Sequence, residues 1–305
     1  MSGRDSAVRL SREVEAALAD GRPVVALEST ITSSFGLPAP HNRDCYERVD
    51  RAIRAVGAVP AVTGVLDGRM IAGVEEEEVE RILAGDWKLA ERDLPIALAR
   101  RASIGVSTVS ATVAIAHLAG IRTFATGGIG GVHRGAESSF DVSSDLGAMA
   151  RHPVIVVSAG AKAFLDLPKT VEYLETLGVP VVGYRCSEFP AFWSRSSGIS
   201  LPHRADSPAD IATIATAAES SGWSGGILVA NPIPASAEIP SAEIAAAIDT
   251  GLAVAAREGA VGPTATPRVL AAIAEATASR SIPANLALAE SNATLAAQIA
   301  VELTR

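Results

Sequence analysis

The sequence predicts an α/β fold, with residues 1–305 forming a single domain. Short apolar runs typical of buried strands alternate with longer segments of helical periodicity, and this alternation indicates strands separated by helices. Apart from a general enrichment in alanine, no linker, repeat or low-complexity tract divides the chain. The apolar fraction of 48% is ample for a buried core, which an aromatic fraction of only 4% leaves mainly to Ala, Val, Ile and Leu.

The elements follow from periodicity and turn residues, taken in chain order. Residues 6–20 have the pattern of an amphipathic helix, and residues 23–27 that of a short buried strand. A helix is predicted at 40–56 and a hairpin at 59–73. The acidic run 75–80 indicates a helix start, because carboxylates stabilise the positive end of the helix dipole. Further strands are predicted at 121–125, 154–158, 179–184 and 227–230, and further helices at 107–119, 208–220, 241–257, 266–277 and 285–303.

Composition narrows the class of protein. A net charge of −8 disfavours a nucleic acid polymer as the main partner, although a local pocket can still be positive. No apolar run is long enough to span a membrane, and the charged N-terminus has no secretory h-region. The cysteines, Cys45 and Cys186, have neither the spacing of a zinc site nor that of a disulfide framework. We therefore expect a cytoplasmic protein with no membrane partner.

Lysine is rare in this chain, and its positions are informative. The sequence contains 26 Lys and Arg residues, of which only Lys88, Lys162 and Lys169 are lysines. Arg replaces Lys well on a surface, but Arg stays protonated and forms no imine, whereas a buried Lys can attack a carbonyl carbon. A retained lysine thus indicates either a chemical role or chance, and composition alone leaves both open.

Polar or glycine-rich clusters follow four of the predicted strands. They begin at Glu28, at Thr126, in the small-residue run before Lys162, and at Asn231. Ligands of open α/β sheets bind outside the carboxyl ends of the strands. We therefore predict that the clusters share one cleft, which points to an enzyme.

Residues 126–135, TGGIGGVHRG, form a glycine-rich turn after a strand. Such a turn exposes backbone N–H groups to a phosphate, and His133 and Arg134 would add charge-assisted contacts. The spacing fits neither a P-loop nor a dinucleotide-binding fingerprint, since no Gly-Lys-Ser/Thr ending is present and His133 replaces the third glycine. A purely structural tight turn is an equally open interpretation.

The segment Asp141-Val142-Ser143-Ser144-Asp145 is dense in oxygen ligands. A hard cation such as Mg²⁺ or Mn²⁺, completed by water, is compatible with it. Spacing alone favours another interpretation, in which Ser143 or Asp141 caps a helix.

Lys162 and Glu28 are the candidates for chemistry. The small residues before Lys162 would desolvate its amine and favour the neutral, nucleophilic form, and we prefer this interpretation to a snorkelling lysine at a helix start. Glu28 ends an apolar strand, where burial favours a protonated carboxyl able to act as general acid or base. A buried ion pair remains an open alternative for Glu28.

Together these segments resemble the pseudouridine-5'-phosphate glycosidase family, also called indigoidine-synthase-A-like proteins. The resemblance covers nearly the whole chain, and it is specific because several long motifs occur in the family's order. They are VVALESTI (24–31), RDLP (92–95), FATGGIGGVHRGAE (124–137), FDVSSDL (140–146), SAGAKAFLDL (158–167), TVEYLETLGVPVVGY (170–184), PAFW (190–193), ANPIP (230–234) and ANLALAESNA (284–293).

The resemblance implies a three-layer α/β/α fold with a central mixed sheet, and a homotrimer. It matches Lys162 to the imine-forming nucleophile, Glu28 to the proton donor, and Asp141 to an aspartate that holds Mn²⁺, or Mg²⁺, largely through waters. The positions that match substrate-binding residues, or lie in motifs beside them, are Lys88, Val109, Thr126, His133, Ser143, Ser144, Asp145 and Asn292.

The implied chemistry explains these residue types. An O- or N-glycoside leaves after protonation of a heteroatom, but a C-glycoside offers no such leaving group. The ribose ring must open, and C1' must be held by an amine while the aglycone carbon is protonated. Lys162 would supply that amine and Glu28 that proton, with ribose 5-phosphate as product. Reversed, the same residues would join ribose 5-phosphate to an electron-rich carbon.

The chain departs from the family's pattern at a few positions. Residues 32–38 read TSSFGLP, with an extra residue and without the family's histidine, and Ser291 replaces the first of two paired asparagines. Gly262-Pro263 and Arg268 are further departures. We expect the departures to cluster on the aglycone side or at the entrance. Phe35 suits a large, flat acceptor, because aromatic rings stack.

Three functions follow as hypotheses. The sequence leans slightly towards C-ribosylation of an aromatic natural product, as in the alnumycin pathway, over cleavage of pseudouridine 5'-phosphate. A non-catalytic sugar-phosphate binding protein is the alternative of another class, and the presence of Glu28, Asp141 and Lys162 counts against it. A nucleotide-cofactor enzyme has little support, because the dinucleotide fingerprint is missing.

Overall fold

The chain is known from a computed structural model that describes residues 7–258, 269, 272–275, 277 and 280–305. Within these residues one sheet contains eleven strands. They are β1 (Val8–Leu10), β2 (Val24–Leu27), β3 (Val59–Leu66), β4 (Arg69–Ala72), β5 (Lys88–Leu89), β6 (Ile104–Ser107), β7 (Thr123–Ala125), β8 (Ile155–Ser158), β9 (Val181–Tyr184), β10 (His203–Ala205) and β11 (Ile227–Ala230).

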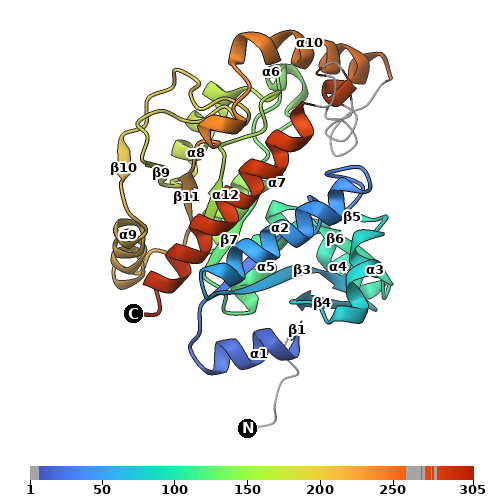
Figure 1. Cartoon of the computed structure of the whole chain (residues 1–305), viewed down its shortest axis with the longest axis vertical. Coiled ribbons are helices and arrows are strands. Elements are labelled where there is room, and N and C mark those ends of the chain that lie inside the picture. Colours follow the sequence, from blue (N-terminus) through green and yellow to red (C-terminus); the bar gives the residue numbers. More distant parts are fainter. Residues whose placement is uncertain (1–6, 259–268, 270–271, 276, 278–279) are drawn as a thin grey trace.

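Helices connect and cover these strands (Figure 1). The α-helices are α1 (Arg12–Ala19), α2 (His41–Ala55), α3 (Val79–Leu83), α4 (Leu94–Ala99), α5 (Val109–Leu118), α6 (Ala136–Ser139), α7 (Ser144–Arg151), α8 (Leu167–Thr176), α9 (Pro208–Ser220), α10 (Ser241–Arg257) and α12 (Ser281–Glu302). The described part of the chain also forms short 3₁₀ helices, which are η1 (Glu76–Glu78), η2 (Glu91–Asp93) and η3 (Ala235–Ala237).

The sheet is mixed. Strands β3, β2, β7, β8, β11, β9 and β10 are neighbours in this order and run parallel. The C-terminal half of β3 leaves the parallel part and pairs antiparallel with β4 and β6. β1 then pairs parallel with β4, and β5 pairs parallel with β6. The parallel strands β2, β8 and β11 are almost wholly apolar because both of their faces are covered.

Helices flank the sheet on its faces. α12 and α2 lie side by side, and α12 also packs against β2, β7 and β8 (Figure 1). α5 packs against β2, β3 and β7 and contacts α7. The three-layer α/β/α architecture with a central mixed sheet, predicted from the sequence, is thereby confirmed.

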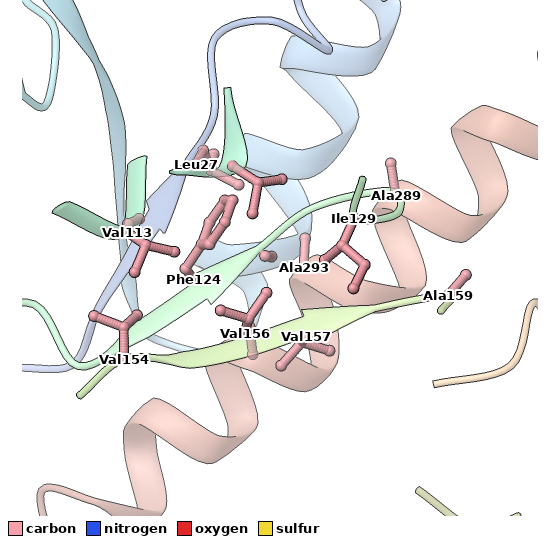
Figure 2. Close-up of a cluster of buried hydrophobic side chains, with 14 of the residues drawn as sticks. Leu27, Val113, Phe124, Ile129, Val154, Val156, Val157, Ala159, Ala289 and Ala293 are labelled. Atoms are coloured by element: carbon pink, nitrogen blue, oxygen red, sulfur yellow. The ribbon is translucent and has the colours of Figure 1, made fainter. Parts of the chain in front are cut away.

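The core lies between these layers and is built mainly from aliphatic side chains. Figure 2 shows Phe124 of β7 and Val156 of β8 among side chains from α5 and α12, including Val113 and Ala293. Alanine on the sheet-facing side of α12 lets the helix approach the strands closely. The buried side chains form one continuous cluster.

One sequence prediction was wrong in its bounds. Residues 6–20 were expected to be helical, but Val8–Leu10 pair with β4 and the helix begins only at Arg12. Ser11 caps that helix, since its hydroxyl accepts a hydrogen bond from the Val14 N–H. Helical periodicity in the sequence was overridden here by strand pairing with a distant segment.

Other predictions were close. The strands predicted at 23–27, 121–125, 154–158, 179–184 and 227–230 are present within one or two residues. The hairpin at 59–73 forms β3 and β4, and the acidic run starts a helix where Glu78 accepts a hydrogen bond from the Glu75 N–H. The helices predicted at 40–56, 107–119, 208–220, 241–257 and 285–303 correspond to α2, α5, α9, α10 and α12. The helix predicted at 266–277 falls largely outside the described residues.

The sequence patterns missed the elements β5, β6, β10, α4, α6 and α8. The helix cap favoured at Ser143 or Asp141 is confirmed at Ser143, where α7 begins. β5 has two residues and β10 has three, too few to show a period of two. β5 and β6 nevertheless matter for the site, because they place Lys88 and the start of α5.

Candidate active site

The polar ends of β2, β7 and β8 surround a cavity of about 190 Å³. The carboxyl ends of parallel neighbours meet at one edge of the sheet. Three of the four clusters predicted to share one cleft contribute to the cavity wall, but the prediction was wrong for the cluster that begins at Asn231, which does not line the cavity. The predicted site residues that line this cavity are Glu28, Lys88, Val109, His133, Asp141, Ser143, Ser144, Asp145 and Lys162.

Glu28 follows β2 and is buried, with 6% of its surface exposed. Its carboxyl accepts a hydrogen bond from the Thr126 hydroxyl at the end of β7. Burial raises the pKa of Glu28, while the positive charge of Lys162 and the Thr126 hydrogen bond partly oppose that rise. The raised pKa favours a protonated carboxyl, as a proton donor requires.

Lys162 reaches the cavity from the segment after β8. Its backbone N–H donates to the Ile129 carbonyl at 3.1 Å, and the Ile129 N–H donates to the Gly160 carbonyl at 3.0 Å. The Lys162 Nζ donates to the Gly128 carbonyl at 3.0 Å. Its amine therefore lies against the glycine-rich turn, and no ion pair between described residues involves it.

Gly160 makes this arrangement possible. Its φ of 81° belongs to the left-handed region, and a Cβ there would collide with the Pro190 carbonyl oxygen. Glycine thus lets the chain turn sharply between β8 and Lys162.

Lys88 lies on β5, which pairs with β6. Burial, followed by the nearby charge of Lys162, lowers the pKa of Lys88, while Asp145 and Glu28 partly restore it. Lys169, in contrast, lies outside the cavity and pairs on the surface with Glu137 at 3.0 Å and Asp166 at 2.9 Å. Two of the three lysines therefore line the cavity, while the third lies on the surface.

Two helix N-termini open onto the cavity. Val109 is the first residue of α5, and Ser143 caps α7 by accepting a hydrogen bond from the Asp145 N–H at 3.2 Å. The positive end of each helix dipole favours an anion there, although the Ser110 N–H of α5 and the Asp145 N–H of α7 already have acceptors. Lys88 would add a full positive charge, so this end of the cavity suits a phosphate group.

Asp145 ties the two helices to the glycine-rich turn. Its Oδ1 accepts from the Ser110 N–H at 2.9 Å, and its Oδ2 accepts from the Gly130 N–H at 2.8 Å. A Cβ on Gly130 would collide with Ser143 and would lie 2.7 Å from the Asp145 Oδ2. The glycine-rich turn is therefore a close-packed structural turn as well as a wall of the cavity.

Asp141 and His133 face each other at the cavity wall, with 3.7 Å between the His133 Nδ1 and the Asp141 Oδ2. Among the described residues no group of three His, Cys, Asp or Glu side chains is placed to hold a metal. A complete protein cage for a metal is thus not seen in the described part of the chain. A single carboxylate beside Ser143 still fits a hard cation that keeps most of its waters.

Thr126 and Asn292 do not line the cavity. Thr126 is 3% exposed and supports Glu28 from behind, while Asn292 is fully buried. The Asn292 Nδ2 donates to the Thr126 carbonyl at 2.8 Å and to the Gly127 carbonyl at 3.3 Å. Both residues contact other residues of the site through hydrogen bonds.

Sequence reasoning missed several residues of the cavity wall, among them Thr30, Arg92, Phe192 and Asn285. Asn285 lies in α12 and its Oδ1 accepts from the Trp193 Nε1 at 2.8 Å. The family motifs PAFW and ANLALAESNA contain these aromatic and Asn residues, so the motifs were a usable signal.

The departures from the family's pattern do not all lie at the cavity. Phe35, Gly36 and Leu37 line it, as expected for the segment 32–38. Ser291 instead contacts Asn231 behind the glycine-rich turn, with 3.1 Å between the Asn231 Nδ2 and the Ser291 Oγ. Gly262, Pro263 and Arg268 lie outside the described residues.

Comparison with known proteins identifies the family to which this chain belongs. Residues 13–302 match the family described as indigoidine synthase A like protein. The chain belongs to this family. The match spans most of the chain, so the resemblance inferred from the motifs is confirmed.

Relatives with curated names are close. A pseudouridine-5'-phosphate glycosidase from Methylobacterium nodulans is 52% identical, over 95% of this chain and 86% of the relative. Another from Solibacter usitatus is 50% identical, over 97% of this chain and 99% of the relative. This chain is accordingly an enzyme of the pseudouridine-5'-phosphate glycosidase family.

Two solved structures share the fold. The prealnumycin C-glycosynthase AlnA, in complex with ribulose 5-phosphate, has a TM-score of 0.90 and 36% identity, covering 99% of this chain and 98% of AlnA. An indigoidine synthase A-like protein from Thermotoga maritima has a TM-score of 0.88 and 35% identity, with full coverage of both chains.

Among the described residues, no helix has the length and apolar character needed to cross a membrane.

Proposed function

We propose that this enzyme cleaves pseudouridine 5'-phosphate to uracil and ribose 5-phosphate through an imine on Lys162. The observation that carries the proposal is that one cavity holds a lysine amine, a buried carboxyl and two helix N-termini. Relatives that are 50–52% identical are named for this activity. The proposal extends that activity to this chain.

The sugar phosphate binds first in the proposed reaction. Its phosphate lies at the N-termini of α5 and α7, near Lys88, where backbone N–H groups and positive charge favour an anion. This end of the cavity is rigid, because Asp145 bonds both to α5 and to the glycine-rich turn. Rigid binding of the phosphate fixes the position of C1' relative to Lys162.

Lys162 and Glu28 then act on the sugar. The ribose ring opens, the Nζ of Lys162 bonds to C1', and the C1'–C5 bond to uracil breaks as Glu28 delivers a proton to C5. Water then hydrolyses the imine, which releases ribose 5-phosphate and restores the amine. The polar contact of Nζ with the Gly128 carbonyl holds the amine in the cavity before reaction.

We further propose that Asp141 holds Mn²⁺ or Mg²⁺, mainly through water molecules. The geometry fits such a cation because Asp141 and Ser143 both line the cavity wall. When bound, the cation would supply positive charge near the phosphate end of the substrate.

A second candidate function is C-ribosylation of an aromatic natural product, the reverse reaction with another acceptor. The observation that favours it is the apolar part of the cavity wall, which Ile31, Phe35, Leu37 and Phe192 form. The named C-glycosynthase AlnA shares the fold at 36% identity. Cleavage has the better support, since the relatives named glycosidases are closer in sequence.

The decisive experiment is to incubate the enzyme with pseudouridine 5'-phosphate and to measure free uracil by liquid chromatography. Steady release of uracil by the wild type, and its loss in Lys162→Met, are expected. Borohydride trapping with ribose 5-phosphate, followed by peptide mass spectrometry, tests the imine independently of the aglycone. Trapping without uracil release would move support to C-ribosylation, and a complete lack of trapping would favour mere sugar-phosphate binding.

The assembly state and compartment are proposals as well. We propose a cytoplasmic homotrimer, for which Phe140 supplies a candidate contact, since this residue is 87% exposed beside Asp141. Both cysteines are free, which suits a reducing compartment. Sedimentation velocity measures the assembly, and Phe140→Ser is expected to shift it towards smaller species.

A further inference from the structure

Asn292 is fully buried and polar, yet it does not line the cavity. Its Nδ2 donates to two consecutive carbonyls, those of Thr126 and Gly127, at 2.8 and 3.3 Å. An amide nitrogen carries two protons, so these bonds use the full donor capacity of that nitrogen. Substrate binding therefore does not explain why this side chain is polar.

The two carbonyls belong to the turn that contacts both catalytic groups. The Thr126 hydroxyl donates to the carboxyl of Glu28, and the Gly128 carbonyl accepts from the Nζ of Lys162. Asn292 thus holds the backbone of residues 126 and 127 from behind, while the front of the same turn contacts the proton donor and the nucleophile.

Asn231 sets the orientation of the Asn292 amide. The Asn231 Nδ2 donates to the Asn292 Oδ1 at 2.9 Å, which leaves the Asn292 Nδ2 facing the turn. Asn231 is itself fixed, because its backbone N–H donates to the Ser158 carbonyl at the end of β8 at 2.8 Å. An amide flip would place the Asn292 Oδ1 against two carbonyl oxygens, which repel it.

We propose that Asn292, oriented by Asn231, is a positioning residue that aligns Glu28 and Lys162 through the turn at residues 126–128. The proposal rests on the proposed function, since it assumes that Glu28 and Lys162 carry the reaction. It assigns Asn292 a place behind the site instead of the substrate contact that the family resemblance suggested. Asn231 acts only through Asn292.

The expected effect is on turnover more than on binding. A displacement of about 1 Å at reacting groups can cost about 100-fold in rate. Phosphate binding depends on α5, α7 and Lys88, which Asn292 does not contact. We therefore expect Asn292→Leu, which keeps the number of side-chain heavy atoms and the branch at Cγ but removes the amide, to lower kcat by about 10- to 100-fold with KM changed less than about threefold.

A second variant keeps the test valid where Asn292→Leu folds poorly. Asn231→Asp places a carboxylate beside the Asn292 Oδ1 and favours the flipped amide, although Asn292 itself is unchanged. The kcat of Asn231→Asp is expected to fall as that of Asn292→Leu does. Ser291→Ala is the matched control, because it removes only the other hydrogen bond of the Asn231 amide, and it should retain the wild-type kcat.

The experiment measures kcat and KM with pseudouridine 5'-phosphate, and the rate of borohydride trapping of ribose 5-phosphate on Lys162. Thermal unfolding is recorded for each variant. The double variant Asn231→Asp/Asn292→Leu is expected to be no slower than Asn292→Leu, because Asn231 acts through Asn292.

The outcomes separate this inference from the proposed function. If the wild type neither releases uracil nor traps ribose 5-phosphate, the proposed function fails. If the wild type is active and folded Asn292→Leu or Asn231→Asp keeps the wild-type kcat, the positioning role is refuted. A rise in KM with unchanged kcat would also overturn it and would instead support direct substrate binding by Asn292.

Discussion

The hydroxyl of Thr126 donates a hydrogen bond to the buried carboxyl of Glu28, although the two residues are 98 positions apart in sequence. The contact follows from strand pairing, because Leu27 of β2 and Ala125 of β7 are partners in the parallel register. Each strand therefore delivers its next residue to the same edge. Glu28 is thereby held at the cavity wall, where the proposed reaction requires a proton donor.

Glu28→Gln is expected to abolish uracil release while leaving imine formation at Lys162 intact. Gln keeps an acceptor for the Thr126 hydroxyl but has no proton of suitable acidity to give. A uracil assay on this variant checks the loss of uracil release, and borohydride trapping checks that the imine on Lys162 still forms. Release of uracil at a rate near that of the wild type would contradict the assignment of Glu28 as proton donor.

The same variant should change the dependence of stability on pH. Burial raises the pKa of Glu28 in the folded state, so the folded protein binds this proton more tightly than the unfolded chain. The contribution of Glu28 to the free energy of unfolding is fully present below the unfolded pKa and is lost as pH rises through the raised folded pKa. Glu28→Gln does not titrate and so does not lose this contribution. The variant should therefore be more stable than the wild type at neutral pH, by about 1 kcal/mol.

Urea unfolding of both proteins at several pH values measures this effect. The difference between the two curves reports the titration of Glu28 together with its charge interaction with Lys88, because the Glu28 charge partly restores the lowered pKa of Lys88 in the wild type. An equal stability difference at every pH would contradict the raised pKa of Glu28.

Lys162→Met is expected to lower turnover by more than about 1,000-fold, since Lys88, the other lysine that lines the cavity, lies at the proposed phosphate end and not at C1'. Lys169→Met is the matched control, because Lys169 pairs with Glu137 and Asp166 on the surface. It should keep nearly full activity, as surface ion pairs contribute about 0–1 kcal/mol. Residual trapping of ribose 5-phosphate in Lys162→Met would place the imine on another lysine.

Lys88→Ala should weaken binding of the sugar phosphate more than it lowers kcat. The lysine lies on β5 beside the phosphate end of the cavity, where it adds charge to the two helix N-termini. For the variant and the wild type, kcat and KM are measured with pseudouridine 5'-phosphate, and the Kd of ribose 5-phosphate is measured by calorimetry. Unchanged affinity together with a large loss of kcat would overturn the division of roles between Lys88 and Lys162.

Gly130→Ala is expected to weaken phosphate binding, because the added Cβ would collide with Ser143 and crowd Asp145. The start of α7 would have to move away from the glycine-rich turn. Gly147→Ala, within α7 itself, is the control and should be neutral or slightly stabilising, since its Cβ would meet only the flexible end of Arg151. Equal Kd values for ribose 5-phosphate in both variants would contradict this packing argument.

Removal of divalent metal with a chelator is expected to lower activity, and Mn²⁺ or Mg²⁺ should restore it. Binding of Mn²⁺, measured by electron paramagnetic resonance, should weaken in Asp141→Asn, because the amide lacks the carboxylate charge. Undiminished Mn²⁺ binding in this variant would show that Asp141 is not the ligand.

The sequence by itself determined the buried strands, the polar clusters that follow them, and the identity of Lys162, Glu28 and Lys88 as candidates. These features are local, because apolar runs and the chemistry of a residue type are read within a few positions. The family resemblance added expected roles for Asp141 and for the residues at the start of α7, which the residue pattern alone had marked as possible metal ligands or a helix cap.

The tertiary structure alone decided how these residues meet. Strand order places Glu28 beside Thr126, and the pairing of β5 with β6 places Lys88 beside the start of α5. It also separated Asn285, which lines the cavity, from Asn292, which supports it from behind. Both lie on one helix and in one motif, and only their packing against distant segments distinguishes them, because contacts between remote residues depend on the whole fold.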